Sequence, residues 1–324
     1  MVHSEFIGGI RKNRKMRFFK KGSYFSQLVI SLSTIFIFSC STDNSNQPGD
    51  TRDKGTIHIS VDESFKPVID SQIQVYESSN PETKIIAHYK PEAECFRDFA
   101  VDSIRMVIVT RGFSESEENF MADSMKVDPQ KMVIAYDAVA VIVNPLVSDS
   151  LFTMTEIKQI LNGSFNKRFI PVFDGLQATS TVRYIVDSVL RGDSLSPKAS
   201  AARTSSLVVD YVSKNANAIG FIGVSWIGNK EDTMQRSFLT KVKIASIEST
   251  DRPGGFVIPL QANIYARRYP MVRDLVYILK EKHNGLGHGF AHFMSGERGQ
   301  LIFRRAYLVP AKQSFNIRSA TLRE

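Results

Sequence analysis

The stretch KMVIAYDAVAVIVNP, residues 131–145, consists almost entirely of β-branched, aromatic or small apolar residues, with one acid, Asp137, near its centre. Its length and its lack of a helical period indicate a buried central strand, or two strands that continue into each other. On both sides of it, short apolar runs alternate with helical patterns. The stretch therefore predicts an α/β protein of two lobes, with this strand crossing from one lobe to the other.

The first 39 residues have a different composition. Seven basic residues precede the apolar residues 28–38, a segment too short to span a bilayer but as long as a signal-peptide core. Cys40 follows, and residues 37–40 (IFSC) resemble the cleavage box of a bacterial lipoprotein, in which the cysteine is acylated. We interpret residues 1–39 as a lipoprotein signal peptide, with a plain membrane anchor as the alternative. Translation starts at Met1 or Met16.

The mature chain is nearly neutral. Seven Lys and Arg against Glu5 give residues 1–39 a charge of +6, which leaves about +2 of the total +8. This balance argues against nucleic-acid binding. Only Cys95 remains after Cys40, so no intrachain disulfide is possible, and Cys95 is expected in the core. Residues 40–54 lack large apolar side chains and are predicted to be a disordered tether.

Polar residues follow two strand patterns of the first lobe. The strand pattern at residues 56–61 leads directly into a helical pattern, with Ser64 at the junction. Free backbone N–H groups at such a junction can bind an anion, although Ser64 also fits a simple helix cap. A later strand pattern ends at Thr110 and Arg111, which are expected at the same sheet edge. A surface salt bridge is an equally good interpretation of Arg111.

The second lobe has a group of hydroxyl side chains at a helix start. Thr179, Ser180 and Thr181 stand before an amphipathic helical pattern and exceed what one cap needs. Their hydroxyl and N–H groups can bind one anion, which the helix dipole also favours. Arg183 lies in the same turn, but Asp187 four residues later offers it an ordinary surface partner.

The C-terminal part is predicted to contain a helix at residues 271–282 and a second helix after a glycine-rich break. His288 and His292 are four apart on that second helix, but no third ligand is near in sequence, so they are interpreted as surface histidines and no metal is expected. The turn at residues 252–255 marks a return to the first lobe. The predicted lobes are residues 55–137 with 252–324, and residues 138–251.

The order of motifs resembles one family. VDESF, IVTRGFSESE, AYDAVAVIVNP, LFTMTEIKQILNGSF, TSTVRYIVDSVL, NAIGFIGVSW and GFAHFMSGERGQLIFRRAYLVPA follow each other as in the PstS-type phosphate-binding branch of the periplasmic solute-binding proteins. The lipoprotein versions of Bacteroidetes are the most similar. The resemblance covers nearly all of residues 55–312, and it is the order of the motifs that is specific. It implies a periplasmic binding protein type II-like fold, with two α/β lobes joined by crossing hinge strands.

The resemblance also implies a function and a set of ligands. It implies a lipoprotein of the cell envelope, facing the periplasm, that captures phosphate or a similar oxyanion for an ABC permease, as a monomer without cofactor or catalysis. The membrane is reached through the lipid on Cys40. By resemblance, the ligand is contacted by a set of hydroxyls and an arginine: Ser64, Thr110 and Arg111 from the first lobe, and Ser180 and Thr181 from the second.

One departure from the family pattern concerns the charge of the site. Many relatives have an arginine followed by Gly-Ser-Gly-Thr before the second-lobe helix, whereas this chain has GLQATST at residues 175–181. Arg111 or Arg183 could supply the charge instead, or the ligand differs. A chain that has lost its ligand and serves as an envelope scaffold or sensor is therefore the alternative function. A hydrolase using Ser180 as nucleophile is disfavoured, because no His or Lys base lies in the same motif.

Carboxylates could select phosphate over sulfate. Phosphate keeps a proton at neutral pH and can donate it to a carboxylate, whereas sulfate cannot. Asp62, Glu63 and Asp137 are the candidate acceptors. Because an unpaired acid in a buried strand is costly, Asp137 is expected to have a partner near the hinge. An Asp137→Asn protein is expected to bind phosphate less well and to tolerate sulfate better.

Overall fold

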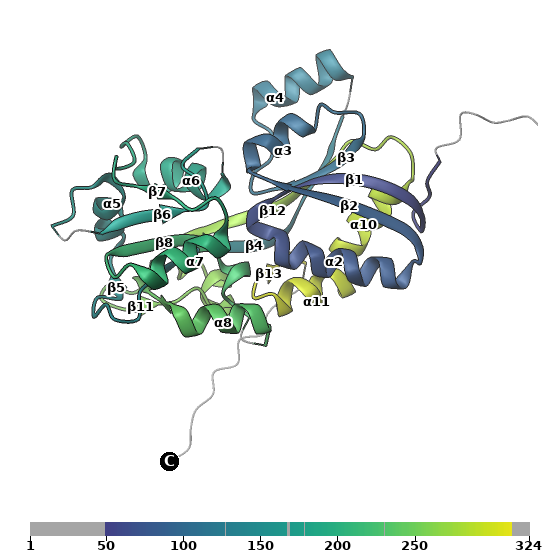
Figure 1. Cartoon of the computed structure of the whole chain (residues 1–324). Helices are drawn as coiled ribbons and strands as arrows, with labels where there is room; N and C mark the ends of the chain where they lie inside the picture. Colours follow the sequence, from purple (N-terminus) through teal and green to yellow (C-terminus); the bar gives the residue numbers. More distant parts are fainter. Residues whose placement is uncertain (1–48, 127, 167–168, 178, 230, 313–324) are drawn as a thin grey trace, which may run out of the picture. The chain divides into compact units, whose positions relative to one another are not determined.

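A computed structural model describes residues 49–126, 128–166, 169–177, 179–229 and 231–312 (Figure 1). The expected signal peptide and Cys40 lie outside these ranges. In the part of the chain that is described, none of the helices combines the length and the apolar character needed to cross a membrane. The main sheet has ten strands in the order β2-β1-β3-β12-β4-β8-β6-β7, and β13 and β9 also pair with β4. The mixed α/β fold expected from the sequence is confirmed.

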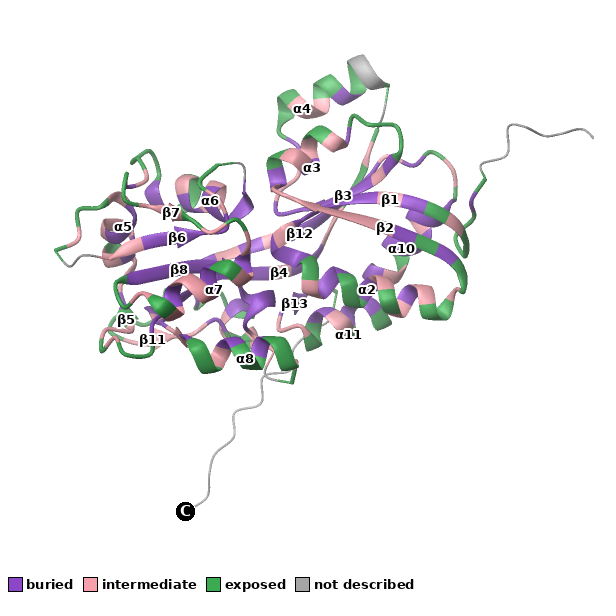
Figure 2. Ribbon diagram, in the orientation of Figure 1, coloured by how far each residue is buried: buried purple, intermediate pink, exposed green. Residues whose placement is uncertain are grey.

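The predicted central strand is β4 (Gln130–Val143), which is fully buried from Asp137 to Val143. Its first part pairs antiparallel with β12 (Val272–Leu279), and its second part pairs antiparallel with β8 (Ala218–Gly223). Figure 2 shows β4 and β8 buried along most of their length. We call the half of the sheet formed by β2, β1, β3 and β12 the first lobe, and the half formed by β8, β6 and β7 the second lobe. β4 belongs to both.

In the first lobe, β1 (Lys54–Asp62) lies between β2 (Glu82–Lys90) and β3 (Ile104–Val109), parallel to both. A 3-10 turn, η2 (Glu63–Phe65), leads from β1 into α2 (Lys66–Ser79), and Pro67 occupies the first turn of α2, where its missing N–H costs nothing. Helices α2, α10 (Leu286–Ser295) and α11 (Glu297–Arg305) cover one face of this lobe, and α3 (Glu92–Asp98) covers the other (Figure 1). The remaining elements are α4 (Glu115–Phe120), a π-helical turn η3 (Met121–Met125), α9 (Gln261–Tyr265) and β13 (Val309–Pro310).

In the second lobe, the strands are β6 (Ile170–Phe173), β7 (Ser200–Ala201), β8 and β9 (Lys243–Ile244). Helix α5 (Met154–Asn162) and helix α6 (Ser180–Tyr184), which continues into the π-helical turn η4 (Ile185–Leu190), lie on one face. Helices α7 (Ser205–Lys214) and α8 (Thr233–Lys241) lie on the other, and a 3-10 turn, η5 (Val224–Trp226), follows β8. The patterns Ser-x-x-Glu at residues 114–117 and Thr-x-x-Glu at residues 153–156 are typical of capping boxes, and both boxes are present, at α4 and at α5.

One sequence expectation meets a different structure. The helix predicted at residues 271–282 is wrong, because this segment is strand β12, inserted between β3 and β4. Because β12 has a neighbouring strand on each side and lies inside the sheet, most of its residues are apolar and do not alternate with polar ones. Such a run cannot be distinguished from a buried helix by its sequence period. After the turn at residues 252–255, β11 (Phe256–Val257) still pairs with β10 (Ser246–Glu248), which in turn pairs with β5 (Leu151–Phe152).

Candidate functional site

The site is formed where the two lobes meet, at Ser64 and Ser180. Ser64 lies in the turn between β1 and α2, and Ser180 is the first residue of α6. Their side chains are fully buried, and their Oγ atoms are 3.3 Å apart. Ser225 of the second lobe also donates a hydrogen bond of 2.8 Å to the carbonyl of Ser64. Two hydroxyls that were expected to approach one ligand from opposite lobes are thus in direct contact.

A buried arginine reaches the same point from the hinge. Arg273 of β12 is paired across the strands with Asp137 of β4, and its Nε donates to Asp137 Oδ2 at 2.8 Å. Its Nη1 donates to Ser180 Oγ at 2.9 Å and to Thr181 Oγ1 at 3.4 Å. The side chains of Arg273 and Asp137 are 1% and 0% exposed, and Arg273 Nη2 has no hydrogen-bond partner among the described residues.

The partner expected for Asp137 near the hinge is therefore confirmed, and it is Arg273. Burial opposes the charge of Arg273, but Asp137 and the nearby Asp62 outweigh it, so the pKa of Arg273 is raised. Sequence reasoning missed Arg273 because it assigned the segment to a helix. The available signal was the requirement that a buried acid must have a cation.

Three further carboxylates surround this cluster. Asp62 accepts from Ser64 N at 3.1 Å through Oδ1, and burial and the charge of Glu92 raise the pKa of Asp62 to about 7. Burial and the charge of Asp174 raise the pKa of Glu63 to about 7. Burial also raises the pKa of Asp174. The interior between the lobes is thus rich in acids that resist ionisation.

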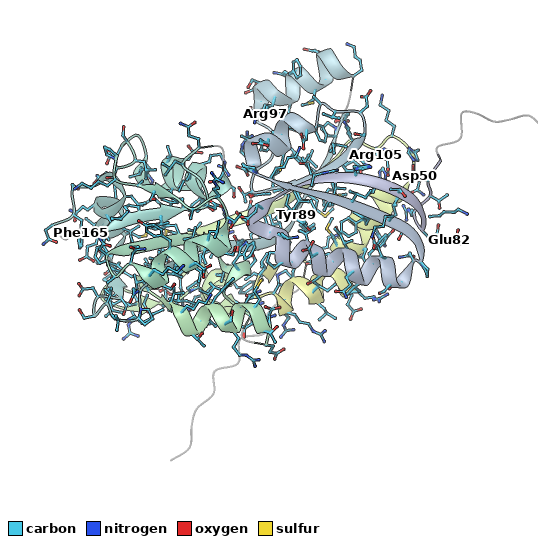
Figure 3. All side chains as sticks on the ribbon, viewed as in Figure 1. Asp50, Glu82, Tyr89, Arg97, Arg105 and Phe165 are labelled. Carbon is cyan, nitrogen blue, oxygen red and sulfur yellow. The ribbon has the colours of Figure 1, made fainter. Side chains whose placement is uncertain are left out.

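These carboxylates line a cavity of about 150 Å³ between the lobes. Tyr89, at the carboxyl end of β2, also lines it and is labelled in Figure 3. The lining residues come from both lobes: Asp62, Glu63, Tyr89, Lys90 and Pro91 from the first, and Asp174, Thr179, Arg203 and Thr204 from the second.

Thr110 belongs to a second contact between the lobes, in which it donates to Glu92. Its N and Oγ1 donate to Glu92 Oε1 at 2.8 and 2.6 Å, and Arg183 Nε donates to Glu92 Oε2 at 2.6 Å. Burial disfavours the charge of Glu92, but the hydrogen bond and charge of Arg183 and the Thr110 donors hold the pKa of Glu92 below its ordinary value. Arg183 also makes the expected contact with Asp187, at 3.3 Å.

Arg111 forms a salt bridge with Glu117, the alternative that was considered for it in the sequence. Its Nη1 and Nη2 donate to the two carboxylate oxygens of Glu117 at 2.7 and 3.0 Å, and its guanidinium lies 4.0 Å from the ring centroid of Phe96.

Glu63 accepts from Ser205 Oγ at 3.0 Å, so this acid bridges the lobes at the start of α7. Thr179 is the N-cap of α6 and accepts from Val182 N.

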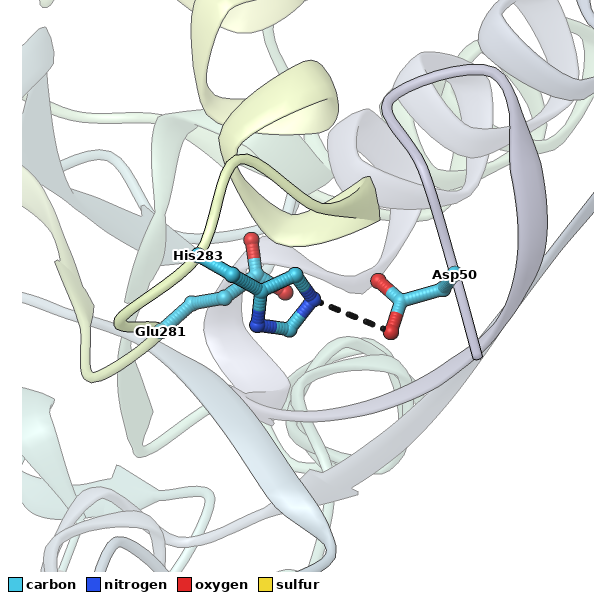
Figure 4. A group of neighbouring side chains, drawn as sticks. All are labelled: Asp50, Glu281 and His283. Atoms are coloured by element: carbon cyan, nitrogen blue, oxygen red, sulfur yellow. Dashed lines mark hydrogen bonds and ion pairs between the residues drawn. The ribbon is translucent and has the colours of Figure 1, made fainter. Parts of the chain in front are cut away.

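One other group of side chains has the composition of a metal site. Asp50, Glu281 and His283 each have a possible ligand atom, and these atoms lie within 4.8 Å of one another (Figure 4). However, Arg105 donates to both carboxylates, and N–H groups of the α10 start donate to Asp50 and Glu281. With a guanidinium already between the acids, the group fits a helix cap better than a cation site. His288 bonds Glu281 at 2.9 Å.

Solved structures with a similar fold include three phosphate-related proteins. A protein from Clostridium perfringens, assigned as a phosphate ABC transporter substrate-binding protein and solved with bound phosphate, is 18% identical, with a TM-score of 0.67 over 80% of this chain and 100% of that one. An ABC-type phosphate transport receptor from Vibrio cholerae is 18% identical, with a TM-score of 0.59 over 79% and 100%. PstS from Borrelia burgdorferi is 18% identical, with a TM-score of 0.51 over 80% and 100%.

At this level of identity, these three structures establish the fold alone. A comparison with curated protein sequences found no match. A family model described as a PBP superfamily domain matches residues 46–298, which include both lobes, the hinge strands and every side chain of the site. The chain therefore belongs to the PBP superfamily, the superfamily of periplasmic-binding-protein-like domains.

Proposed function

We propose that this protein captures a tetrahedral oxyanion between its lobes, with inorganic phosphate as the first choice, and passes it unchanged to an ABC permease. The observation that carries the proposal is Arg273, a buried guanidinium in contact with Ser180 and Thr181, with Nη2 left without a partner. The solved structures of similar fold that are described as phosphate-binding or phosphate-transport proteins support phosphate as the ligand.

Arg273 can supply the charge that the GLQATST loop lacks. The loop has neither arginine nor the expected glycines, but the guanidinium reaches the start of α6 from β12 instead. A hydrogen bond from a buried, charged donor contributes about 1.5–3 kcal/mol, more than a neutral hydroxyl does. Arg273 is therefore proposed as the main positive group for the anion, in the role for which Arg111 or Arg183 was considered.

Ser64 and Ser180 are proposed to bind the anion from opposite lobes. In the structure they use each other as partners at 3.3 Å, which leaves no room for a phosphate between them. The lobes must separate slightly for the ligand to enter, and an oxyanion can then accept from both hydroxyls and from Arg273 at once. Thr181 is a further donor from the second lobe.

A catalytic role has less support. Ser180 Oγ accepts from the guanidinium of Arg273 and lies 3.3 Å from Ser64 Oγ, and its sequence motif contains no His or Lys base. A scaffold or sensor of the same fold has one specific observation in its favour, since Glu92 already occupies the donors of Thr110 and Arg183. The oxyanion-binding role is preferred because it explains the unpartnered nitrogen of Arg273.

We propose from the sequence pattern that Cys40 is acylated and that the monomeric protein faces the periplasm at the cell envelope. Of the disordered tether predicted at residues 40–54, the described residues 49–54 belong instead to the folded part, because Asp50 accepts from Leu286 N at 2.8 Å and β1 begins at Lys54. The residues between Cys40 and Gly49 are proposed to connect the lipid to the folded part. Incorporation of a labelled fatty acid, and its loss in Cys40→Ala, would test the anchor.

The test of ligand binding is thermal unfolding of the full chain with phosphate, sulfate or molybdate. A ligand that binds only the folded state at 100 times its Kd stabilises by about 2.7 kcal/mol. For a domain of this size that is a Tm rise of roughly 5–10 °C. The Arg273→Met protein should show a much smaller rise with phosphate. If none of the three anions raises the Tm of the unaltered protein, the proposed function is wrong.

A further inference from the structure

Two acids that line the cavity between the lobes each have a buried carboxylate oxygen without a partner. Asp62 is 1% exposed and Asp174 is 6% exposed, and both line the cavity. Asp62 Oδ2 and Asp174 Oδ1 are buried and have no hydrogen-bond partner among the described residues. A buried acceptor without a partner is destabilising, and more so when it is charged. Two such oxygens at one cavity call for a group that donates hydrogen bonds.

The surrounding cations do not meet this need. Arg273 donates its Nε to Asp137, and Lys90 at the cavity wall is paired with Asp98 at 2.7 Å. Arg203 also lines the cavity, but it is exposed, so its charge is strongly screened by water. Glu63, the third acid of the cavity, has the hydroxyl of Ser205. The unpartnered oxygens of Asp62 and Asp174 therefore remain without a donor.

The size of the cavity limits what can fill it. A volume of about 150 Å³ is comparable to that of an engineered protein cavity that holds a benzene molecule. A small organic ion fits this space, whereas a nucleotide or a sugar phosphate does not.

We propose that this cavity binds the primary ammonium group of a small phosphonate or phosphate compound, whose oxyanion end is held by Arg273, Ser64 and Ser180. The inference rests on the proposed function, because it uses the same oxyanion site. An ammonium group has three donors and one positive charge, so it can satisfy Asp62 Oδ2 and Asp174 Oδ1 together. The ligand class is thus a small zwitterion, and inorganic phosphate fills only the oxyanion half of the site.

An isosteric pair of ligands tests this proposal. Aminomethylphosphonate and ethylphosphonate have the same number of non-hydrogen atoms and differ by an ammonium in place of a methyl group. Calorimetric titration of the full chain should show aminomethylphosphonate binding about tenfold tighter or more, because hydrogen bonds between charged groups are the strong ones. Asp62→Asn and Asp174→Asn should each reduce this ratio toward one. Asp210→Asn, an exposed acid of α7 paired with Lys241, is the matched control and should leave the ratio unchanged.

The outcomes separate this inference from the proposed function. If phosphate binds and the unaltered protein prefers ethylphosphonate or shows no preference, the ammonium site is refuted while the oxyanion site stands. If neither phosphate nor either phosphonate binds, the proposed function itself fails. The comparison of the two ligands needs no variant, so poor folding of an Asn protein leaves the test intact.

Discussion

Replacement of Arg273 by methionine separates the two roles of the buried ion pair, stability and anion binding. The change keeps much of the side-chain length but leaves Asp137, 0% exposed, without its cation. Breaking a buried pair from one side costs about 3–5 kcal/mol, because a desolvated charge remains unpaired. For a domain of this size the corresponding loss in Tm is roughly 6–20 °C.

The second variant removes both charges. In Arg273→Met with Asp137→Asn no buried charge is left alone, so at least half of the lost Tm should return. Phosphate binding should not return, because the charged donor to the anion is missing in both proteins. A loss of about 1.5–3 kcal/mol corresponds to roughly 10- to 150-fold weaker binding.

Thermal unfolding of the two variants measures their stability, and calorimetric titration measures their affinity for phosphate. Arg97→Met, an exposed arginine of α3, is the control and should change neither quantity appreciably. The reasoning is refuted if the single variant is as stable as the unaltered protein. It is equally refuted if the double variant binds phosphate with undiminished affinity.

Three further predictions concern the same region. The pKa of Glu92 is lowered in the folded protein, so its ion pair with Arg183 stabilises the fold above the ordinary Glu pKa of about 4.3. This stability is lost as the pH falls through the folded-state pKa. In urea unfolding between about pH 2 and 6, the Arg183→Met protein should therefore lose less stability on acidification than the unaltered protein. The pKa of Asp62 is raised to about 7, so its burial costs stability as pH rises from about 4 to 7, and urea midpoints of Asp62→Asn should fall less over that interval. A Cβ at Gly223 would lie 3.0 Å from the buried guanidinium nitrogen Nη2, so Gly223→Ala should weaken phosphate binding in calorimetry, whereas Gly112→Ala, with no contact closer than 3.8 Å, should not.

Much of the fold follows from local sequence. The central strand, the capping boxes and the junctions at Ser64 and Ser180 have patterns that depend on near neighbours only, and the structure has them in the expected places. The convergence of these two serines was implied by the family resemblance alone. In the structure it arises in one further step: β1 and β6 lie in different halves of the sheet and run in opposite directions, so the carboxyl ends of both point toward the middle of β4. The Oγ distance of 3.3 Å agrees with that step.

The parts that were not predicted depend on contacts between distant segments. β12 is a strand because it pairs with β3 and β4, more than a hundred residues earlier in the chain, and no local pattern encodes that pairing. The role of Arg273 could not be identified while its segment was assigned to a helix. Glu92 likewise has an ordinary position at a helix start, and only the folded structure brings Arg183 to it.

The contacts of Glu92 decide where an anion can bind. Its carboxylate already accepts from both donors of Thr110 and from Arg183, as a bound oxyanion would. Because Glu92 is part of the chain, it competes at the high effective concentration of an intramolecular group, at least millimolar. A free anion at Thr110 would have to displace it and leave a buried acid without partners. At Arg273 the unpartnered Nη2 has no such competitor among the described residues. The contact between Ser64 and Ser180 must open, but an oxyanion can accept from both hydroxyls and adds a hydrogen bond to Nη2. The physics therefore favours the serines and the hinge arginine over Thr110 as the binding point.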